Sequence, residues 1–326
     1  MQKEDKEYFG SILKQIKSKF NRCFWPDGSC NDKAINAHSI QNSVVLDLLC
    51  DDSNHIIMPK MELDINTGPK FYFDRVGRNR ATTFNGLCDK HDAQLFEPID
   101  KYTFSPDNQE QLFLIAYRSV LRELHTKMKG AVDIQSQYIK GLDLGRFSTD
   151  GFDEPSAIAT VNLMEAYMFY RYKFEFDQIY LNEDYGQVLH KFDFIENVKP
   201  AIAVSSVYSL IDNIKLPRDR EDPKSIILNV FPYDTGLYII FSFKKRQKQH
   251  FFSHVEMITQ AEKYYKLYLI SKLVLMHCEN FAISPDIYNS FSTEKVELIE
   301  KFFMNNLFVE KNDAEDKNLN LFYNER

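Results

Sequence analysis

The sequence predicts an α+β protein in which a small N-terminal module with paired Cys and His residues precedes a larger helix-strand-helix domain. Three observations lead to this fold class. Apolar residues recur at helical spacing over 105–129 and 155–180, they alternate as in strands beyond residue 192, and four of the five Cys lie before residue 89. With 326 residues, of which 44% are hydrophobic, the chain is long enough for one large core or two smaller ones.

Composition and charge exclude several classes of protein. The 27 Phe and 18 Tyr residues supply too much apolar surface for a disordered chain, and a net charge of -7 argues against a protein that grips nucleic acid by bulk charge. No run approaches the roughly 18 apolar residues of a membrane helix, and the charged opening segment lacks a signal-peptide core. We therefore expect a cytoplasmic protein without membrane contact, in which paired Cys and His indicate a metal site rather than disulfides.

The first hundred residues consist of short elements separated by turns. Phe9, Ile12, Leu13 and Ile16 follow the i, i+3, i+4, i+7 pattern, which predicts a helix over residues 6–20. Further along, the pattern predicts turns over 21–32, a short helix over 43–49, a strand at 71–73, a polar loop over 77–83 and a short helix at 93–96 that ends before Pro98.

A boundary near residues 98–106 divides the chain into a module of residues 1–100 and an α+β domain of residues 101–326, to which the sequence assigns no role. Ser105 is placed as the cap, and Pro106 at the first position, of a helix that runs to about Lys129. A loop over 141–153 follows, and then a long aromatic helix from about Pro155 to Tyr180.

Strand patterns begin after residue 192. Alternation predicts a strand over 202–210, and two apolar runs around Tyr233–Gly236 predict a hairpin over 226–243. Ser253 and Glu256 have the spacing of a capping box, which predicts the start of a helix that continues to about His277. A last helix is expected over 293–307, and the polar residues from Lys311 onward are expected to fray.

Four residues of the N-terminal module are candidate ligands of one metal ion. Cys23 and Cys30 flank a turn rich in Gly and Asp, and Cys88 and His91 have a spacing that suits the first turn of a helix. Thiolate and imidazole donors in a tetrahedral set select zinc. A zinc ion would also explain how a segment with so little regular structure stays folded. The alternative is a pair of buried thiols with an incidental His.

Three stretches resemble the HNH endonuclease family, in this order: Ala37-His38-Ser39-Ile40, Asn85-Gly86-Leu87 and His91-Asp92-Ala93-Gln94-Leu95-Phe96. The resemblance covers residues 20–100 and implies a treble-clef or ββα-metal fold that hydrolyses phosphodiesters, with DNA as substrate. It implies that His38 is the general base, that Asn85 orients the motif, and that His91 binds a catalytic Mg2+ or Mn2+ ion on the scissile phosphate. A small nuclease module fused to a recognition domain is also a feature of bacterial defence against phage.

The resemblance leaves alternatives open, because His91 is assigned to both zinc and the catalytic metal. If zinc takes His91, then Asp92 is the nearby acid for a catalytic ion and His38 stays the base. A module that kept the fold and lost nuclease activity would instead bind nucleic acid or protein. In a third arrangement His38 itself joins the zinc ligands, which leaves no base.

Two basic runs without intervening acids border the Cys residues. Lys17 and Lys19 precede Cys23, and the arginines at 75, 78 and 80 precede Cys88. These five side chains are candidate phosphate contacts, namely Lys17, Lys19, Arg75, Arg78 and Arg80. The alternative is that they are solvated faces of a helix and a hairpin.

Overall fold

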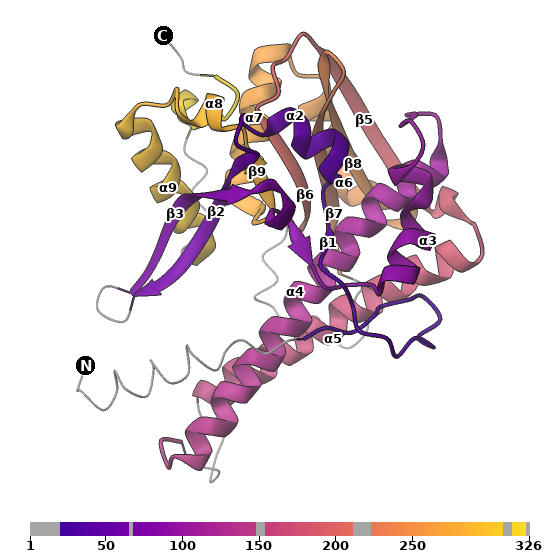
Figure 1. The fold of residues 1–326 in the computed structure, drawn as a ribbon, viewed down its shortest axis with the longest axis vertical. Coiled ribbons are helices and arrows are strands. Elements are labelled where there is room, and N and C mark those ends of the chain that lie inside the picture. Colours follow the sequence, from indigo (N-terminus) through magenta and orange to yellow (C-terminus); the bar gives the residue numbers. More distant parts are fainter. Residues whose placement is uncertain (1–19, 65–67, 148–153, 211–222, 309–314, 324–326) are drawn as a thin grey trace.

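A seven-stranded antiparallel sheet lies at the centre of the protein in this computed structural model (Figure 1). The structure describes residues 20–64, 68–147, 154–210, 223–308 and 315–323. The predicted mixture of helices and strands is confirmed. In sheet order the strands are β3 (Gly68–Gly77), β2 (His55–Asp64), β9 (Phe281–Ile283), β6 (Ile202–Tyr208), β7 (Ile226–Tyr233), β8 (Gly236–Lys244) and β5 (Val188–Glu196).

The hairpin of β7 and β8 confirms the prediction for residues 226–243. Its strands are buried along nearly their whole length because helices cover both faces of the sheet. The turn is closed by Asp234, whose φ of +50° is a left-handed conformation that Asp tolerates better than most residues. Side chains therefore alternate between two cores rather than between a core and solvent.

Helices cover both faces of the sheet. On one face α6 (Lys248–Thr259), α7 (Lys263–His277) and α9 (Thr293–Phe308) form the largest buried cluster with the strands. On the other face α4 (Gln109–Asp143) packs against β6 and β7. The helix α5 (Glu154–Leu181) packs along α4, and Figure 1 shows the pair extending from the sheet as a long arm.

The N-terminal module is connected to this sheet. Its strands β1 (Ala37–His38) and β4 (Thr83–Phe84) pair with each other and are followed by α3 (Asp89–Asp100). Between them lie a helical segment over 42–49, as predicted, and the hairpin of β2 and β3, which pairs with β9 from near the other end of the chain. The predicted division near residue 100 therefore does not coincide with an edge of the sheet.

Two predicted helix starts are wrong. The first long helix begins at Gln109 rather than Pro106, because Asn108 is its N-cap and accepts a 3.1 Å hydrogen bond from the backbone of Gln111. Ser253 does not open a helix, since it lies inside α6, which starts at Lys248. The expected single helix to His277 is two helices, with a break between Thr259 and Lys263 that the apolar pattern of both helices conceals.

The chain near the C-terminal end is more ordered than its composition predicts. Leu319, Leu321 and Phe322 are buried against α7 and α9, so the expectation that residues beyond 311 fray is wrong for 315–323. The helix expected over 6–20 lies outside the described residues, apart from Phe20. Within the described part of the chain, no helix combines the length and hydropathy needed to span a lipid bilayer.

Candidate metal centre

The first pair of candidate ligands is positioned by a tight turn. Gly28 donates a backbone hydrogen bond to Trp25 (2.9 Å) and has a φ of +69°, a conformation that favours glycine. The side chain of Asp27 accepts a 2.8 Å hydrogen bond from the backbone of Ser29. These bonds fold the segment back on itself, so that Cys23 and Cys30 face the same point.

The second pair lies at the start of α3. Cys88 is the N-cap residue, and its side chain makes no capping hydrogen bond, so the thiol is free to point toward the first pair. His91 follows in the first helical turn on the same side. The loop is joined to this helix start by a 2.7 Å hydrogen bond from the backbone of Phe24 to the carbonyl of Gly86, where a Cβ atom would lie only 2.3 Å from the Phe84 ring.

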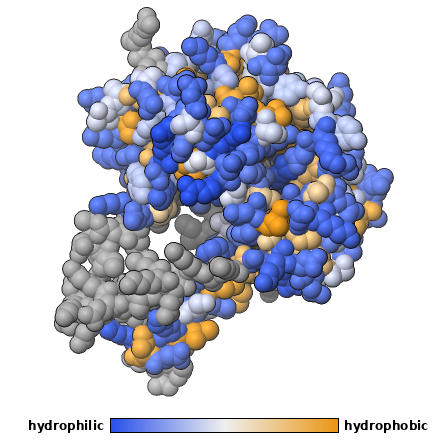
Figure 2. Space-filling view, in the orientation of Figure 1, coloured by the Kyte–Doolittle hydropathy of each residue, from blue (hydrophilic) through white to orange (hydrophobic). Residues whose placement is uncertain are grey.

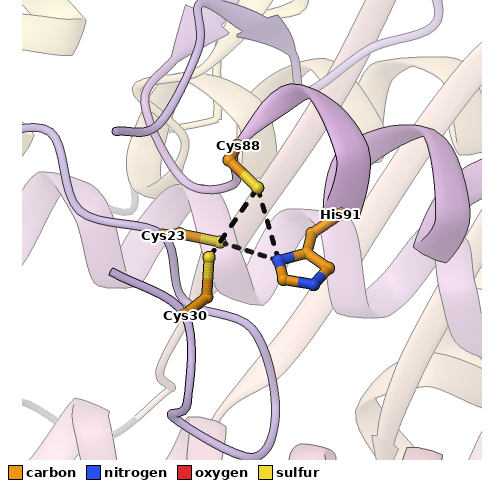
Figure 3. A group of neighbouring side chains, drawn as sticks. All are labelled: Cys23, Cys30, Cys88 and His91. Atoms are coloured by element: carbon orange, nitrogen blue, oxygen red, sulfur yellow. Dashed lines mark hydrogen bonds between the residues drawn. The ribbon is translucent and has the colours of Figure 1, made fainter. Parts of the chain in front are cut away.

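The four side chains converge on one point, as Figure 3 shows. The Sγ atoms of Cys30 and Cys88 are 3.8 Å apart, and Nδ1 of His91 lies 3.5 Å from Sγ of Cys23 and 3.3 Å from Sγ of Cys88. Zinc bonds of about 2.3 Å to sulfur and about 2.0–2.1 Å to nitrogen in a tetrahedron place two sulfurs about 3.8 Å apart, and sulfur and nitrogen about 3.5 Å apart. The donor set and its spacing therefore fit a zinc ion.

Burial and an aromatic contact define the surroundings of the four donors. All three thiols are buried, and burial raises the pKa of Cys23 to about 12, which backbone N–H groups of Cys88 and Trp25 only partly offset. A divalent cation reverses this effect because it binds the thiolate form. The indole of Trp25 stacks on the His91 ring at 4.1 Å and 12°, which fixes the plane of the imidazole. Figure 3 shows the second ring nitrogen of His91, Nε2, directed away from the sulfurs.

The residues predicted to be catalytic lie apart from this cluster. His38 is half-buried, its Nε2–H donates to the carbonyl of Arg78 (3.2 Å), and its pKa is lowered mainly by burial and also by the charge of Arg118. Burial raises the pKa of Asp92, against the opposing effect of Arg118. Asn85 follows β4 and is half-buried.

These residues do not assemble a second metal site. Among the described residues, Cys23, Cys30, Cys88 and His91 are the one set of three or more His, Cys, Asp or Glu side chains whose donor atoms lie together. His38 and Asp92 join no such set. A catalytic Mg2+ or Mn2+ ion therefore has no ready cluster of ligands in the part of the chain that the structure describes.

The predicted phosphate contacts are largely engaged elsewhere. Arg75 pairs with Asp51 and Arg78 pairs with Asp47. Arg80 is exposed, and Lys17 and Lys19 lie outside the described residues. Neighbouring carboxylates thus neutralise two of the three described arginines.

Two important residues near the centre, Lys173 and Trp25, were not identified from the sequence. Nζ of Lys173, on α5, donates a 2.6 Å hydrogen bond to the carbonyl of Phe24 and pairs at 2.9 Å with Asp177. Burial lowers the pKa of Lys173 and raises that of Asp177. The sequence does not single out this pair, because Arg171 and Glu175 on the same helix are also opposite charges four residues apart. The stacking role of Trp25 had no signal either.

The local architecture is thus a cluster of three thiols and one imidazole that joins a loop, a helix start and, through Lys173, the long arm. Comparisons of the chain with protein-family models, with curated proteins and with solved structures found no match.

Proposed function

We propose that this protein is a non-catalytic zinc module, HNH-like in its order of elements, that holds a protein-contact surface in place. The observation that carries the proposal is that Nδ1 of His91 lies 3.3 and 3.5 Å from two thiol sulfurs, as in a tetrahedral zinc site, with the third sulfur within 4.8 Å. Zinc bound there takes His91 and leaves Asp92 without further ligands for a catalytic ion. The zinc is structural, because all four of its positions are filled by protein.

The order of elements supports the HNH-like, treble-clef part of the proposal. A strand that carries His38, a second strand, and a helix with one candidate metal ligand at its N-cap and another in its first turn follow one another as β1, β4 and α3. The hairpin of β2 and β3 is then an insertion between the two strands. Zinc stabilises such a small arrangement by holding together segments that have little core of their own.

The surface near the centre favours protein over nucleic acid as partner. On α5 the side chains of Leu163, Tyr167, Tyr170 and Phe174 are 47, 61, 43 and 48% exposed. They recur at spacings of four, three and four residues, which is the spacing of a helix-packing seam. Figure 2 shows hydrophobic side chains on the surface of this arm. A groove of about 450 Å3 connects the seam to Trp25, which lies in the turn between Cys23 and Cys30, here called the zinc loop. Apolar surface of this kind marks contact sites.

Metal analysis tests the zinc site. We expect one zinc ion per chain in the purified wild-type protein, and its loss in Cys23→Ser and Cys88→Ser. Cys50→Ser is the matched control, because Cys50 lies outside the cluster, and it should keep the metal. Wild-type protein without stoichiometric zinc would contradict the proposal. Reduced thiol ligands are in keeping with a reducing compartment, and we propose the cytoplasm as the location.

A second candidate function is a DNA endonuclease that uses His38 and Asp92, as in defence against phage. It is favoured by the lowered pKa of His38, which keeps the ring neutral at pH 7, and by the hydrogen bond to Arg78, which leaves Nδ1 as a free base. Plasmid nicking with Mg2+ or Mn2+ that disappears in His38→Ala, and persists in the exposed-site control His250→Ala, would establish this function. Loss of zinc in His38→Ala would instead make His38 a structural ligand.

A further inference from the structure

A cavity of about 300 Å3 lies between α4 and the sheet, apart from the metal centre. Its walls come from the segment after β1, the connection between α3 and α4, the side of α4 that carries Ile115 and Arg118, and the strands β6 and β7. The volume is at the lower end of small-molecule sites in proteins. No residue assigned to zinc or to catalysis lines it.

The inner end of the cavity is polar. Ser205 on β6 and Asn229 on β7 lie directly opposite each other in the sheet. Ser119 of α4 contacts both, with its Oγ 2.8 Å from Oγ of Ser205 and donating at 3.0 Å to Oδ1 of Asn229. A helix, two strands and three polar side chains thus form one hydrogen-bonded group behind the cavity, which is unusual in an otherwise apolar core.

One donor of this group has no partner among the described residues. Asn229 is 4% exposed and lines the cavity, yet its Nδ2 makes no hydrogen bond. A buried amide N–H without a partner is unfavourable, because it has lost its hydrogen bonds to water. A ligand that accepts a hydrogen bond from Nδ2 would give this donor a partner. The cavity therefore offers both room for a ligand and a polar group that binding would satisfy.

The second polar element is the guanidinium of Arg118. Its two terminal nitrogens donate to Asp100 at 3.0 and 2.6 Å, and its plane lies 4.0 Å over the ring of Phe96. Its Nε is buried and makes no hydrogen bond within the part of the chain that the structure describes. Asp100 neutralises this cation, and the other cation of the lining, Lys101, pairs with Glu97 at 2.8 Å, so the lining offers hydrogen-bond donors without an unpaired charge that would demand an anion.

The remaining wall is aromatic. Phe104 packs edge-on against Phe231 and Tyr233, at centroid distances of 5.5 and 6.1 Å, and all three rings line the cavity. Such rings offer apolar faces and edges against which a flat ring system can pack. We infer that the cavity binds a neutral nitrogen heterocycle of the nucleobase class, whose ring nitrogen or carbonyl oxygen accepts from Nδ2 of Asn229.

Titration calorimetry of the full chain with adenosine, guanosine, inosine, cytidine and uridine tests this site. We expect at least one nucleoside to bind one-to-one with a Kd below about 1 mM, and to lose at least tenfold in affinity in Asn229→Leu. Asn306→Leu, a buried amide in α9 on the other face of the sheet, is the matched control and should bind as wild type.

A second variant keeps the test decisive if Asn229→Leu fails to fold. Ile115→Trp fills the cavity from α4 and should abolish binding in a protein that retains its zinc. Binding of a ten-nucleotide single strand but of no free nucleoside would show that the base is taken from a polymer, with the same loss in both variants. Absence of binding by every nucleoside and by the oligonucleotide, or equal binding by wild type and both variants, would overturn the inference.

Discussion

Lys173 connects the metal centre to the long helical arm through a single side chain. Its ammonium group donates to a backbone carbonyl of the zinc loop and pairs with Asp177, which also accepts from the hydroxyl of Tyr117. Both charged side chains are only 4% exposed. Compared with apolar residues of similar size, a buried ion pair of this kind adds little to the free energy of unfolding. Removal of one partner is nevertheless strongly destabilising, because the other charge stays buried without a counter-ion.

Lys173→Met should therefore destabilise the protein by about 3–5 kcal/mol in urea unfolding, because Asp177 loses its counter-ion and the Phe24 carbonyl loses its donor. Zinc transfer to a coloured chelator should also be faster. Lys101→Met is the control, since Lys101 forms an exposed pair with Glu97, and it should cost less than about 1 kcal/mol. Equal losses in the two variants would refute the role given to Lys173.

A second residue-scale prediction concerns pH. Burial lowers the pKa of His190 to about 4, and its Nδ1 lies 2.8 Å from Oγ of Ser242. Because the folded pKa lies below the unfolded value of about 6.5, the unfolded state binds more protons as the pH falls, and stability is lost below about pH 6.5. His190→Gln should remove about 1 kcal/mol of the loss between pH 7 and pH 5.5. The control His250→Gln, at an exposed position, should keep the wild-type pH profile.

The residue types and spacings were sufficient to predict that Cys23, Cys30, Cys88 and His91 come together as a possible metal site, because thiols and imidazoles in two local pairs have few other uses. They were not sufficient for Lys173 or Asn229. The role of Lys173 depends on a carbonyl 149 residues away, and that of Asn229 on the register between two strands. Such roles arise from tertiary contacts that no local pattern encodes.

At the scale of elements, periodicity succeeded where a segment has one regular environment. The helices α5 and α9 and the hairpin of β7 and β8 follow their predicted limits closely. The strand β2 was missed because Pro59 interrupts its pattern. In the structure β9 pairs with β2 only at Ile57, so Pro59 has β3 on one side and no described strand opposite it on the other, as in an edge strand.

The exposed seam of α5 leads to a prediction about association. Its four apolar positions carry no charge, so two copies can pack together without repulsion, and we expect the protein to be a dimer through this helix. Tyr167→Lys combined with Phe174→Lys should yield a monomer in sedimentation velocity runs at about 100 µM protein. Tyr264→Lys with Tyr265→Lys is the matched control, because these tyrosines of α7 are 61 and 50% exposed, and it should remain a dimer. A monomeric wild type would contradict the prediction.

At the scale of the whole molecule, residues from near the two ends of the described chain complete the core. The segment after α9 returns to bury Leu319, Leu321 and Phe322, and the backbone of Leu321 donates a 2.9 Å hydrogen bond to Ser271 on α7. Composition gave no indication of this docking, because the surrounding residues are polar and the apolar ones too few to form a periodic pattern.

A chain that ends after Asp316 should lose about 4–6 kcal/mol of stability, since each buried apolar side chain contributes roughly 1.5–3 kcal/mol and part of this burial persists in the unfolded chain. Thermal unfolding measures the change. A chain that ends after Tyr323 retains the docked segment and serves as the control, which should unfold like the full chain. The prediction fails if the two truncated chains unfold at the same temperature.

The position of β9 between β2 and β6 also sets an order of events during synthesis. The hairpin of β2 and β3 is translated early, but the strand that joins it to the rest of the sheet leaves the ribosome only after residue 283. The metal ligands are complete much sooner, once His91 has emerged. If zinc binds as proposed, it would hold together the two ends of the segment that contains the hairpin before β9 is available. In that case a bound ion would fix the ends of this segment in position before β9 has been synthesised.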